Sequence, residues 1–345
     1  MDMATWEANP AGAFADAAAA FGSRLVSLAA SPASPVSLLS LLTALFLGAA
    51  FLIATRRRGR QVPIKVLARA LFPRRITHAA STRTDLGFAL FNIFAFGALF
   101  GWGLMSYRIV GAAVGHGLTQ IFGAPTPSGL DGAAASAILT VALFLAYELG
   151  FWLDHYSSHK IPFFWEIHKV HHTATVLTPL TIFRVHPIEA IKLANILAVV
   201  MGVTFAVVTR LLGEPVTQIQ LFGQNVILLV LMIVASHLQH THLWIPFTGP
   251  LGRIMISPAH HQIHHSDNPA DFGKNLGGYL ALFDWMFGTL RVPTAKRLPL
   301  TFGVAPQAET DHAFASVALR PVRSAFRQLK GSSAGPAADP LSARP

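Results

Sequence analysis

Long apolar runs constrain this chain more than any other feature of its sequence. PVSLLSLLTALFLGAAFLIA (35–54) and LGFALFNIFAFGALFGWGLM (86–105) carry no charge, and AAASAILTVALFLAYELGFWL (133–153) is interrupted only by Glu148. Each is about as long as the roughly 20 helical residues that a bilayer core requires. Only 12% of the 345 residues are charged, about half the fraction typical of a soluble domain. The sequence therefore predicts an integral membrane protein.

Two further apolar stretches, 191–208 and 217–236, contain polar residues and are less clear. The short segment TRLLGEP (209–215) separates them, so we expect a helical hairpin that either spans the membrane or dips into it. The predicted fold is all-α: an integral membrane helical bundle with four to five transmembrane or re-entrant helices and a histidine-rich helical cap on the cytoplasmic side.

The orientation follows from the placement of basic residues. Residues 56–83 contain nine Lys and Arg residues and no acid: Arg56, Arg57, Arg58, Arg60, Lys65, Arg69, Arg74, Arg75 and Arg83. The positive-inside rule makes this loop cytoplasmic, which places the start of the chain outside and predicts a short outer loop at 107–131. Every later histidine cluster then falls on the cytoplasmic side.

Charge and cysteine content exclude several classes of function. The net charge of +10 does not indicate nucleic-acid binding, because the basic residues lie at membrane boundaries where topology and lipid headgroups account for them. The chain has no cysteine, which rules out disulfides, thiolate metal sites and iron–sulfur clusters. Any metal must be held by nitrogen or oxygen.

Histidines cluster in patterns that suit metal binding. WEIHKVHHT (165–173) and ISPAHHQIHHS (256–266) both contain HxxHH, and DHYSSH (154–159) contains HxxxH. Residues three or four apart share one face of a helix, so each motif presents its imidazoles together. SHLQHTHLWIP (236–246) and FRVHPIE (183–189) supply four more histidines.

Simpler explanations account for only some of these residues. A lone histidine near a membrane is usually an interfacial or core residue. We interpret His78, His116 and His312 as residues of that kind. One structural zinc takes four ligands, whereas at least eight histidines here have helical spacing. Without metal, crowded imidazoles would need buried partners or would repel when protonated. We therefore expect two metal ions, and nitrogen ligands alone leave Fe, Zn, Cu and Ni open.

The ordered motifs resemble the sterol desaturase / fatty acid hydroxylase superfamily of integral membrane di-iron oxygenases, in its bacterial form, over roughly residues 85–292. ELGFWLDHYSSHKIPFFWEIHKVHHTA (148–174) looks like the family's first histidine block, and SPAHHQIHHS (257–266) looks like its second HxxHH. FRVHPIE (183–189) resembles a sequence element of the family's bacterial members, and NLGGYLALFDWMFGTL (275–290) is similar to the signature that ends the family's domain.

This resemblance implies a set of site residues. The implied metal ligands are His155, His159, His168, His171, His172, His237, His240, His261, His264 and His265. The catalytic candidates are Glu148 and His186. Glu148, in place of the more usual Asp, would orient a ligand imidazole, and His186 would be a ligand or lie beside one. His242 stands where the family often has Asn and receives no firm role, and His260 lies outside the HxxHH register and would support the site or be neutral.

One further departure and one possible ion pair complete the comparison. Tyr156 stands where the family commonly has Arg, which weakens assignment to any subfamily. Arg184 and Glu189 could pair across the turn at His186.

The resemblance also implies an activity. Two Fe ions, with O2 as co-substrate, would hydroxylate or desaturate a C–H bond of a lipid substrate, sterol-like or fatty-acyl; zinc lacks the redox states for this. No GxGxxG or CxxCH motif is present, so a separate electron donor is expected, such as a ferredoxin or cytochrome b5-type protein with its reductase. The basic loop 56–83 and Arg320, Arg323, Arg327 and Lys330 could steer it, although contact with lipid headgroups is the more ordinary role. The alternatives are a carotenoid ring hydroxylase of the same chemistry and a non-catalytic membrane metal-binding or transport protein.

Four segments are expected along the chain. Residues 1–34 form an N-terminal segment without the basic region of a cleaved signal, and 35–83 form the first transmembrane helix and the basic loop. Residues 84–295 form the catalytic domain. Residues 296–345 form a tail, disordered over 332–345. We expect a multi-pass membrane protein whose active site lies on the cytoplasmic side. If the protein is bacterial, the membrane is the inner membrane.

Overall fold

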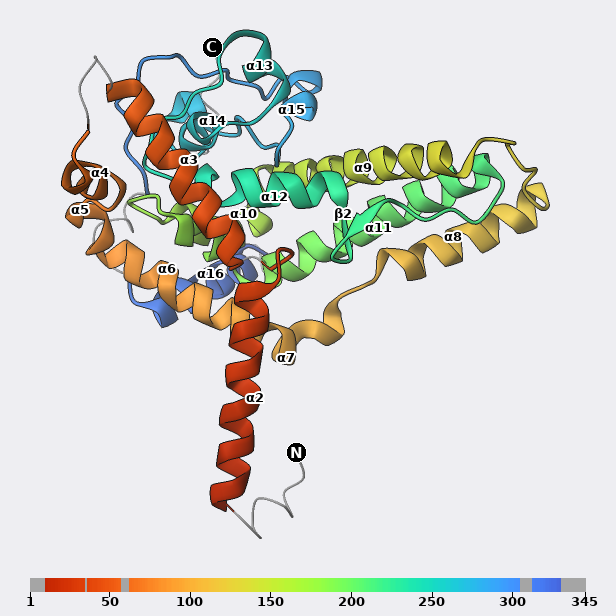
Figure 1. Cartoon of the computed structure of the whole chain (residues 1–345), viewed down its shortest axis with the longest axis horizontal. Coiled ribbons are helices and arrows are strands. Elements are labelled where there is room, and N and C mark those ends of the chain that lie inside the picture. The colour runs from red at the N-terminus through yellow and green to blue at the C-terminus, as the bar shows by residue number, and fades with distance from the viewer. Residues whose placement is uncertain (1–9, 35, 57–61, 305–311, 330–345) are drawn as a thin grey trace.

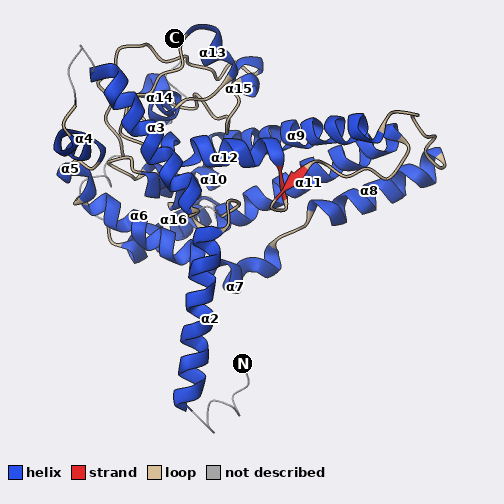
Figure 2. Cartoon of the chain, viewed as in Figure 1, coloured by secondary structure: helices blue, strands red, loops and turns tan. Residues whose placement is uncertain are grey.

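The computed structural model describes residues 10–34, 36–56, 62–304 and 312–329. Nearly all regular structure in these ranges is helical, and Figure 2 shows one small β-ribbon among the helices. That ribbon pairs β1 (Gln220–Leu221) with β2 (Gln224–Asn225) in antiparallel register. The predicted helical fold is confirmed.

Four helical segments are long and apolar enough to cross a membrane. They are α3 (Leu38–Arg56), the composite segment Ala80–Phe122, α9 (Gly132–Lys160) and α11 (Pro187–Leu212). Many of their large side chains are exposed, Phe46 by 70% and Ile109 by 71%. Apolar side chains on the outside of a helical bundle are what a lipid environment favours.

The second of these segments departs from the single helix expected at 86–105. It consists of α6 (Ala80–Leu90), a π-helical turn (Phe91–Ala95), α7 (Phe96–Phe100), a 3₁₀ turn (Gly101–Gly103) and α8 (Tyr107–Phe122). The predicted outer loop at 107–131 is wrong in its first part, because Ser106 caps α8 by accepting from the backbone N–H of Arg108. Only 123–131 remains a loop.

Helices α8, α9 and α11 run side by side as a long arm of the molecule (Figure 1). Two glycines let α8 and α11 approach closely. A methyl group at Gly202 would lie 2.6 Å from Cβ of Val110, and one at Gly111 would lie 2.8 Å from the ring of Phe205. Small residues at such crossings allow van der Waals contact between membrane helices.

The hairpin expected at 191–236 has a longer connection than predicted. Helix α11 ends at Gly213, whose φ of 73° is left-handed, and α12 (Val226–Gln239) begins only after the β-ribbon. Asn225 starts α12 by accepting from the backbone N–H groups of Ile227 and Leu228. A helix of 14 residues rises only about 21 Å, less than the roughly 30 Å of a bilayer core, so α12 does not span it alone.

The cap at the histidine end of α9 is built from short helices. These are α10 (Pro162–His172), α13 (Gly249–Ile254), α14 (Pro258–His264), α15 (Leu282–Met286) and α16 (Phe314–Leu329). Two 3₁₀ turns, Pro179–Phe183 and Pro269–Asp271, join them. The basic stretch expected as a loop is largely helical, with α4 (Ile64–Leu71) and α5 (Arg74–Thr77).

The N-terminal helix α2 (Pro10–Ala30), which the sequence reading did not anticipate, points away from the rest of the molecule (Figure 1). The predicted disordered tail 332–345 lies outside the described residues. The segment boundaries expected at 34, 83 and 295 stay predictions.

Candidate metal centre

Nine buried or nearly buried histidines meet in two groups at the end of α9. In each group, every residue offers one ring nitrogen, and these nitrogens all lie within 4.8 Å of one another. The first group is His155, His159, His168, His172 and His264; the second is His171, His240, His261 and His265. They come from α9, α10, the end of α12 and α14, which are far apart in the sequence.

In the first group, His155 and His264 each have one ring nitrogen held by a hydrogen bond, which leaves the other ring nitrogen free to bind a metal. Nδ1 of His155 donates to the carbonyl oxygen of Leu276 at 2.8 Å, and Nδ1 of His264 donates to that of Lys274 at 2.9 Å. A carbonyl can only accept, so Nε2 of both rings carries the lone pair. Both Nε2 atoms are buried without a hydrogen-bond partner among the described residues.

In the second group, four Nε2 atoms converge. The Nε2 atom of His240 lies 3.1 Å from that of His171 and 2.8 Å from that of His261, which lies 3.1 Å from that of His265. Nδ1 of His171 donates to the carbonyl oxygen of Arg184 at 3.2 Å, so its Nε2 is an acceptor. A shared cation satisfies several converging lone pairs better than hydrogen bonds between the rings can.

The two groups adjoin one another. The ring centroids of His172 and His265 are 4.6 Å apart, and those of His264 and His265 are 5.3 Å apart. His171 and His172 are adjacent on α10, but their side chains belong to different groups. The arrangement therefore suits two adjacent ions better than one.

Burial keeps five of these rings neutral: those of His171, His172, His240, His264 and His265. It lowers the pKa of His171 to about 4 and that of His264 to about 3, against neighbouring backbone hydrogen bonds that raise them. Burial, with repulsion from neighbouring imidazoles, also holds the pKa values of His172, His240 and His265 well below the usual range. Neutral imidazoles with inward lone pairs are the form that binds metal. The residues present thus fit a metal centre held by nitrogen.

A comparison with protein families finds a match in this part of the chain. Residues 140–289, which include all nine histidines, match the fatty acid hydroxylase family. These residues are called the hydroxylase region below. No solved structure gives a significant match.

Curated relatives of the hydroxylase region are alkylglycerol monooxygenases. The Caenorhabditis elegans protein is 29% identical over 142 residues, covering 40% of this chain and 24% of the relative. The Danio rerio protein is 27% identical over 155 residues, covering 42% and 29%, and the Homo sapiens protein is 25% identical over 161 residues, covering 44% and 31%. The chain thus spans about a quarter to a third of the length of these relatives.

Nine of the ten predicted ligands of this hydroxylase region lie in the two groups, and His237 does not. It is buried on α12, one turn before His240, and contributes to the lowered pKa of that residue. His242, left without a firm role, donates through Nε2 to the carbonyl oxygen of Ala70 at 2.8 Å. His260 bonds Ser257 through Nδ1 and the carbonyl oxygen of Gly252 through Nε2, a supporting position.

The two predicted catalytic residues hold the framework of the hydroxylase region. Glu148 accepts from the backbone N–H groups of Tyr279 and Leu280, at 3.0 and 2.7 Å, so its carboxylate ties α9 to the loop after α14 and does not bond an imidazole. His186 caps α11 through Nδ1 and donates through Nε2 to the carbonyl oxygen of Ala318 at 3.1 Å. Both residues lie outside the two groups.

The carboxylate that bonds an imidazole is Glu189, in the first turn of α11, which contacts Nδ1 of His168. The predicted pairing of Arg184 with Glu189 is therefore wrong. Arg184 is fully buried and pairs with Asp85 on α6, with 2.7 Å between Nε and Oδ1. This pair fixes the segment whose carbonyl oxygen accepts from His171.

Sequence reasoning also missed the polar residues that hold the loop 274–291. The carboxylate of Asp284 accepts from the backbone N–H groups of Leu276 and Gly277, at 2.9 and 2.8 Å. Asn275, with a left-handed φ of 56°, donates to the carbonyl oxygens of His260 and Arg291 at 3.0 Å each. Both residues lie in NLGGYLALFDWMFGTL (275–290), which resembles the closing signature of the family. That resemblance was the one signal in the sequence that pointed to them.

Proposed function

We propose that this chain contains the catalytic part of a membrane-bound monooxygenase that hydroxylates a C–H bond of a lipid. The observation that carries this proposal is the pair of adjoining groups of imidazoles inside the hydroxylase region. Nine nitrogen ligands exceed what one structural zinc uses. The abundance of nitrogen donors instead suits two redox-active ions.

The proposed metal is iron, one ion in each group. Bound iron would supply O2-dependent oxidising chemistry, which zinc lacks because it has no accessible redox change. The chain's own residues would hold the ions in register through the fixed Nδ1 atoms of His155, His168 and His264. Burial of the rings would keep water away from the reacting carbon.

The reaction balances with an external reductant. A C–H bond and one O2 molecule, with two electrons and two protons, give a C–OH group and water. The described residues offer no nucleotide-binding fold, because their only strands are β1 and β2. The proposed source of the electrons is a separate donor, such as a ferredoxin or a cytochrome b5-type protein with its reductase.

The first substrate class to test is the alkylglycerols, because the relatives are alkylglycerol monooxygenases. A lipid would reach the centre from the bilayer, since α9 and α11 both leave the apolar arm beside the first histidine group. Fatty-acyl, sterol-like and carotenoid substrates, and desaturation in place of hydroxylation, use the same ligand chemistry and are compared in the same assay.

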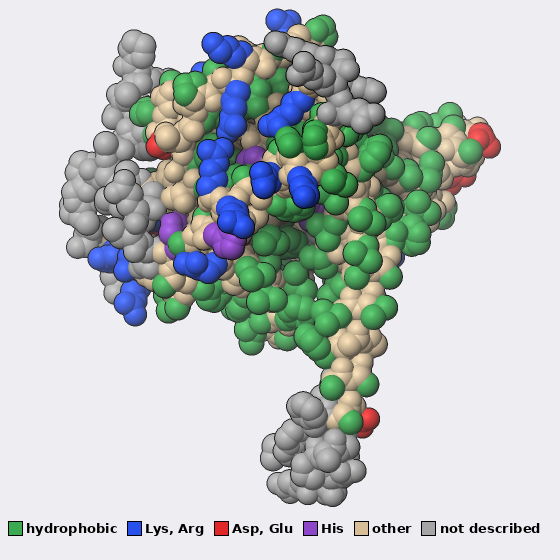
Figure 3. All heavy atoms as spheres, turned by 60° about the vertical axis from the view of Figure 1, so that its left-hand side comes forward, with side chains coloured by type: hydrophobic (Ala, Val, Ile, Leu, Met, Phe, Trp, Pro, Cys, Tyr) green, Lys and Arg blue, Asp and Glu red, His purple; other side chains and the backbone are tan. Residues whose placement is uncertain are grey.

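We propose that the metal centre lies on the cytoplasmic side of the membrane. On the face that Figure 3 shows, Lys and Arg side chains gather over the cap, while hydrophobic side chains dominate the lower part. The described basic residues of α4 to α6 are exposed: Lys65, Arg69, Arg74, Arg75 and Arg83. The positive-inside rule assigns such a face to the cytoplasm.

The test is turnover of an alkylglycerol by purified protein in bilayer nanodiscs under ¹⁸O2, with a chemical reductant and a ferredoxin–reductase couple. We expect a hydroxylated or cleaved product containing ¹⁸O, and loss of at least 100-fold in rate for His261→Ala. His242→Gln, outside both groups, is the matched control and should keep most of the rate. Bound zinc with no O2 consumption would overturn the proposal in favour of a metal-binding or transport protein.

A further inference from the structure

Five large apolar side chains are exposed along α13 and α15, two short helices of the cap. The two helices adjoin, because the backbone N–H of Ala281, which starts α15, donates to the carbonyl oxygen of Ile254 at 2.9 Å. An exposed apolar surface of this kind is typical of a contact with another protein or with a membrane. The five residues, called the α13–α15 patch, are exposed by 48% to 64%: Leu251 and Ile254 on α13, Trp285 and Met286 on α15, and Phe287 directly after it.

The patch stands beside α9, one of the four described segments long and apolar enough to cross a membrane. The ring of Phe287 stacks on that of Trp152 in α9, with centroids 4.4 Å apart, and Nε1 of Trp152 donates to the carboxylate of Asp284 at 3.3 Å. Residues 141, 145 and 152 share one face of α9, and Val141 and Leu145 on that face are exposed. The patch therefore continues the apolar face that α9 would present to lipid.

The length of α9 sets the depth of the patch. This helix begins at Gly132 and has 29 residues, more than the roughly 20 that cross a hydrocarbon core. A helix that enters the core at Gly132 leaves it about 20 residues later, close to Trp152. The ring of Phe287 on Trp152, and with it the patch, is then level with the boundary between acyl chains and headgroups.

The residue types and the charge of the patch also suit that boundary. Tryptophan is enriched where the membrane core meets water. Arg253 is exposed between the two patch residues of α13, and Asp284, the only acid in 249–254 and 282–287, is buried. The surface thus offers apolar and basic groups without an exposed carboxylate, which matches the surface of an anionic bilayer.

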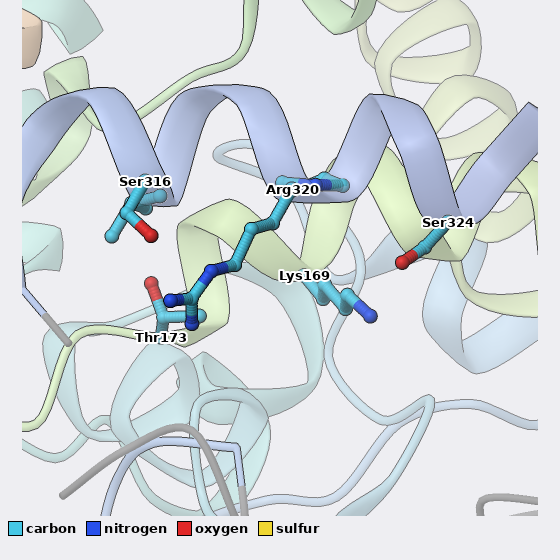
Figure 4. A pocket seen from close by; sticks show the side chains of 7 residues that line it. Lys169, Thr173, Ser316, Arg320 and Ser324 are labelled. Carbon is cyan, nitrogen blue, oxygen red and sulfur yellow. The ribbon is translucent and has the colours of Figure 1, made fainter. Parts of the chain in front are cut away.

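The opposite side of the cap, at α16, carries a polar groove. In Figure 1, α13 and α15 lie above α14, and α16 lies below it. Figure 4 shows Lys169, Arg320 and three hydroxyl side chains between α10 and α16, and Lys169 pairs there with Glu166 of its own helix. The apolar surface beside α9 thus lies on the α13–α15 side of the cap and not at this groove.

We propose that the α13–α15 patch inserts into the surface of the bilayer beside the end of α9, at the boundary between acyl chains and headgroups. A second copy of this chain or another protein would also cover apolar side chains, but neither accounts for the level of the patch or for its continuity with the exposed face of α9. Insertion would tie the membrane surface to the loop 274–291, which contains three of the patch residues and the carbonyl groups that accept from His155 and His264. The proposal does not rest on the proposed reaction.

The experiment uses the full chain in nanodiscs that contain phosphatidylglycerol, without turnover, so its failure is distinct from failure of the proposed enzyme. Because the chain has no cysteine, a nitroxide spin label attaches at one chosen site. The test variants are Met286→Cys and Ile254→Cys, at exposed sites on separate helices, so that one serves if the other does not fold. Val141→Cys on α9 is the lipid-facing control, and Lys296→Cys, exposed on the cap, is the water-facing control.

Electron paramagnetic resonance compares collisions of the label with O2, which concentrates in the bilayer, and with a water-soluble nickel chelate. We expect the O2-to-nickel ratio at both patch sites to be about tenfold above that of Lys296→Cys and to approach that of Val141→Cys, because the patch reaches the acyl boundary. A ratio like that of Lys296→Cys would place the patch in water and overturn the proposal. Low accessibility to both reagents would also overturn it, because a protein surface would then cover the patch.

Discussion

The Nδ1 atoms of His155, His171 and His264 each donate to a backbone carbonyl oxygen, and Nδ1 of His168 contacts a carboxylate, that of Glu189. A carbonyl fixes the tautomer of a ring, whereas a carboxylate also raises its basicity. If His168 binds a metal, as we propose, its bond to that metal depends on the side chain of Glu189.

The first prediction concerns that side chain. Glu189→Gln keeps an acceptor oxygen but removes the negative charge, so metal affinity of the first group should fall about ten- to 100-fold. The measurement is retention of bound metal against a graded chelator. Glu166→Gln, which alters a carboxylate on the outer side of α10, should leave retention unchanged, and equal retention in all three proteins would exclude this role for Glu189.

The sequence, through its histidine spacing and the family resemblance, predicted which histidines gather but not the residues that hold them. HxxxH and HxxHH place imidazoles on one helical face whatever surrounds them, and nine of the ten proposed histidines meet. The partners of Glu148, Arg184 and Glu189 depend on tertiary contacts more than 100 residues away or on neighbouring helices. A linear pattern carries no information about such contacts.

At the scale of elements, the loop 274–291 is a scaffold for the first histidine group. Its backbone carbonyls at Lys274 and Leu276 accept from His264 and His155, and its shape depends on Asp284. Glu148 ties the same loop to α9.

The second prediction follows from that dependence. Asp284→Ala would leave the buried N–H groups of Leu276 and Gly277 without their acceptor, so unfolding free energy should fall by on the order of 3 kcal/mol. Thermal unfolding of the metal-free protein in detergent measures it. Asp267→Ala, at an exposed carboxylate bonded to Thr301, is the control, and similar melting of both variants would contradict the scaffold role.

The third prediction concerns the crossing of α8 and α11. Gly202→Val would place a side chain against Val110 and the carbonyl oxygen of Tyr107, and overpacking of this kind costs about 1–3 kcal/mol. Gly117→Ala on α8, where an added Cβ meets nothing within 4 Å, should be neutral. The readout is the midpoint of thermal aggregation in detergent; a Gly202→Val midpoint equal to that of wild type would show that the crossing is looser than described.

Element boundaries were predictable only where the apolar pattern was uninterrupted. The third apolar run became α9 with little change, since nothing within it stops a helix. The run at 217–236 was misread because Asn225 caps a helix from inside it and Phe222 and Gly223 adopt left-handed turn angles. The π-helical turn at Phe91–Ala95 has no signal in composition, because it satisfies its backbone much as an α-helix does.

At the scale of the whole molecule, the cap and the tip of the arm should lie on opposite sides of the bilayer. Ser128 belongs to the exposed loop that bonds the end of α11, through its N–H and the carbonyl oxygen of Leu212. Lys296 is exposed on the cap. Arm length and basic charge together predict which side each occupies.

The fourth prediction uses the absence of cysteine. Single variants Ser128→Cys and Lys296→Cys give clean labelling with a membrane-impermeant maleimide. In intact cells Ser128→Cys should label, and Lys296→Cys should label only after permeabilisation. The reverse pattern would place the metal centre outside the cell.

Whether the nine histidines hold two iron ions is tested by the metal content of purified protein, measured by elemental analysis beside protein concentration. We expect two irons per chain in the wild type and about one in the double variant His240→Ala/His261→Ala, which removes half of the second group. No iron in the wild type under iron-replete growth, or the same iron content in both proteins, would contradict the two-iron proposal.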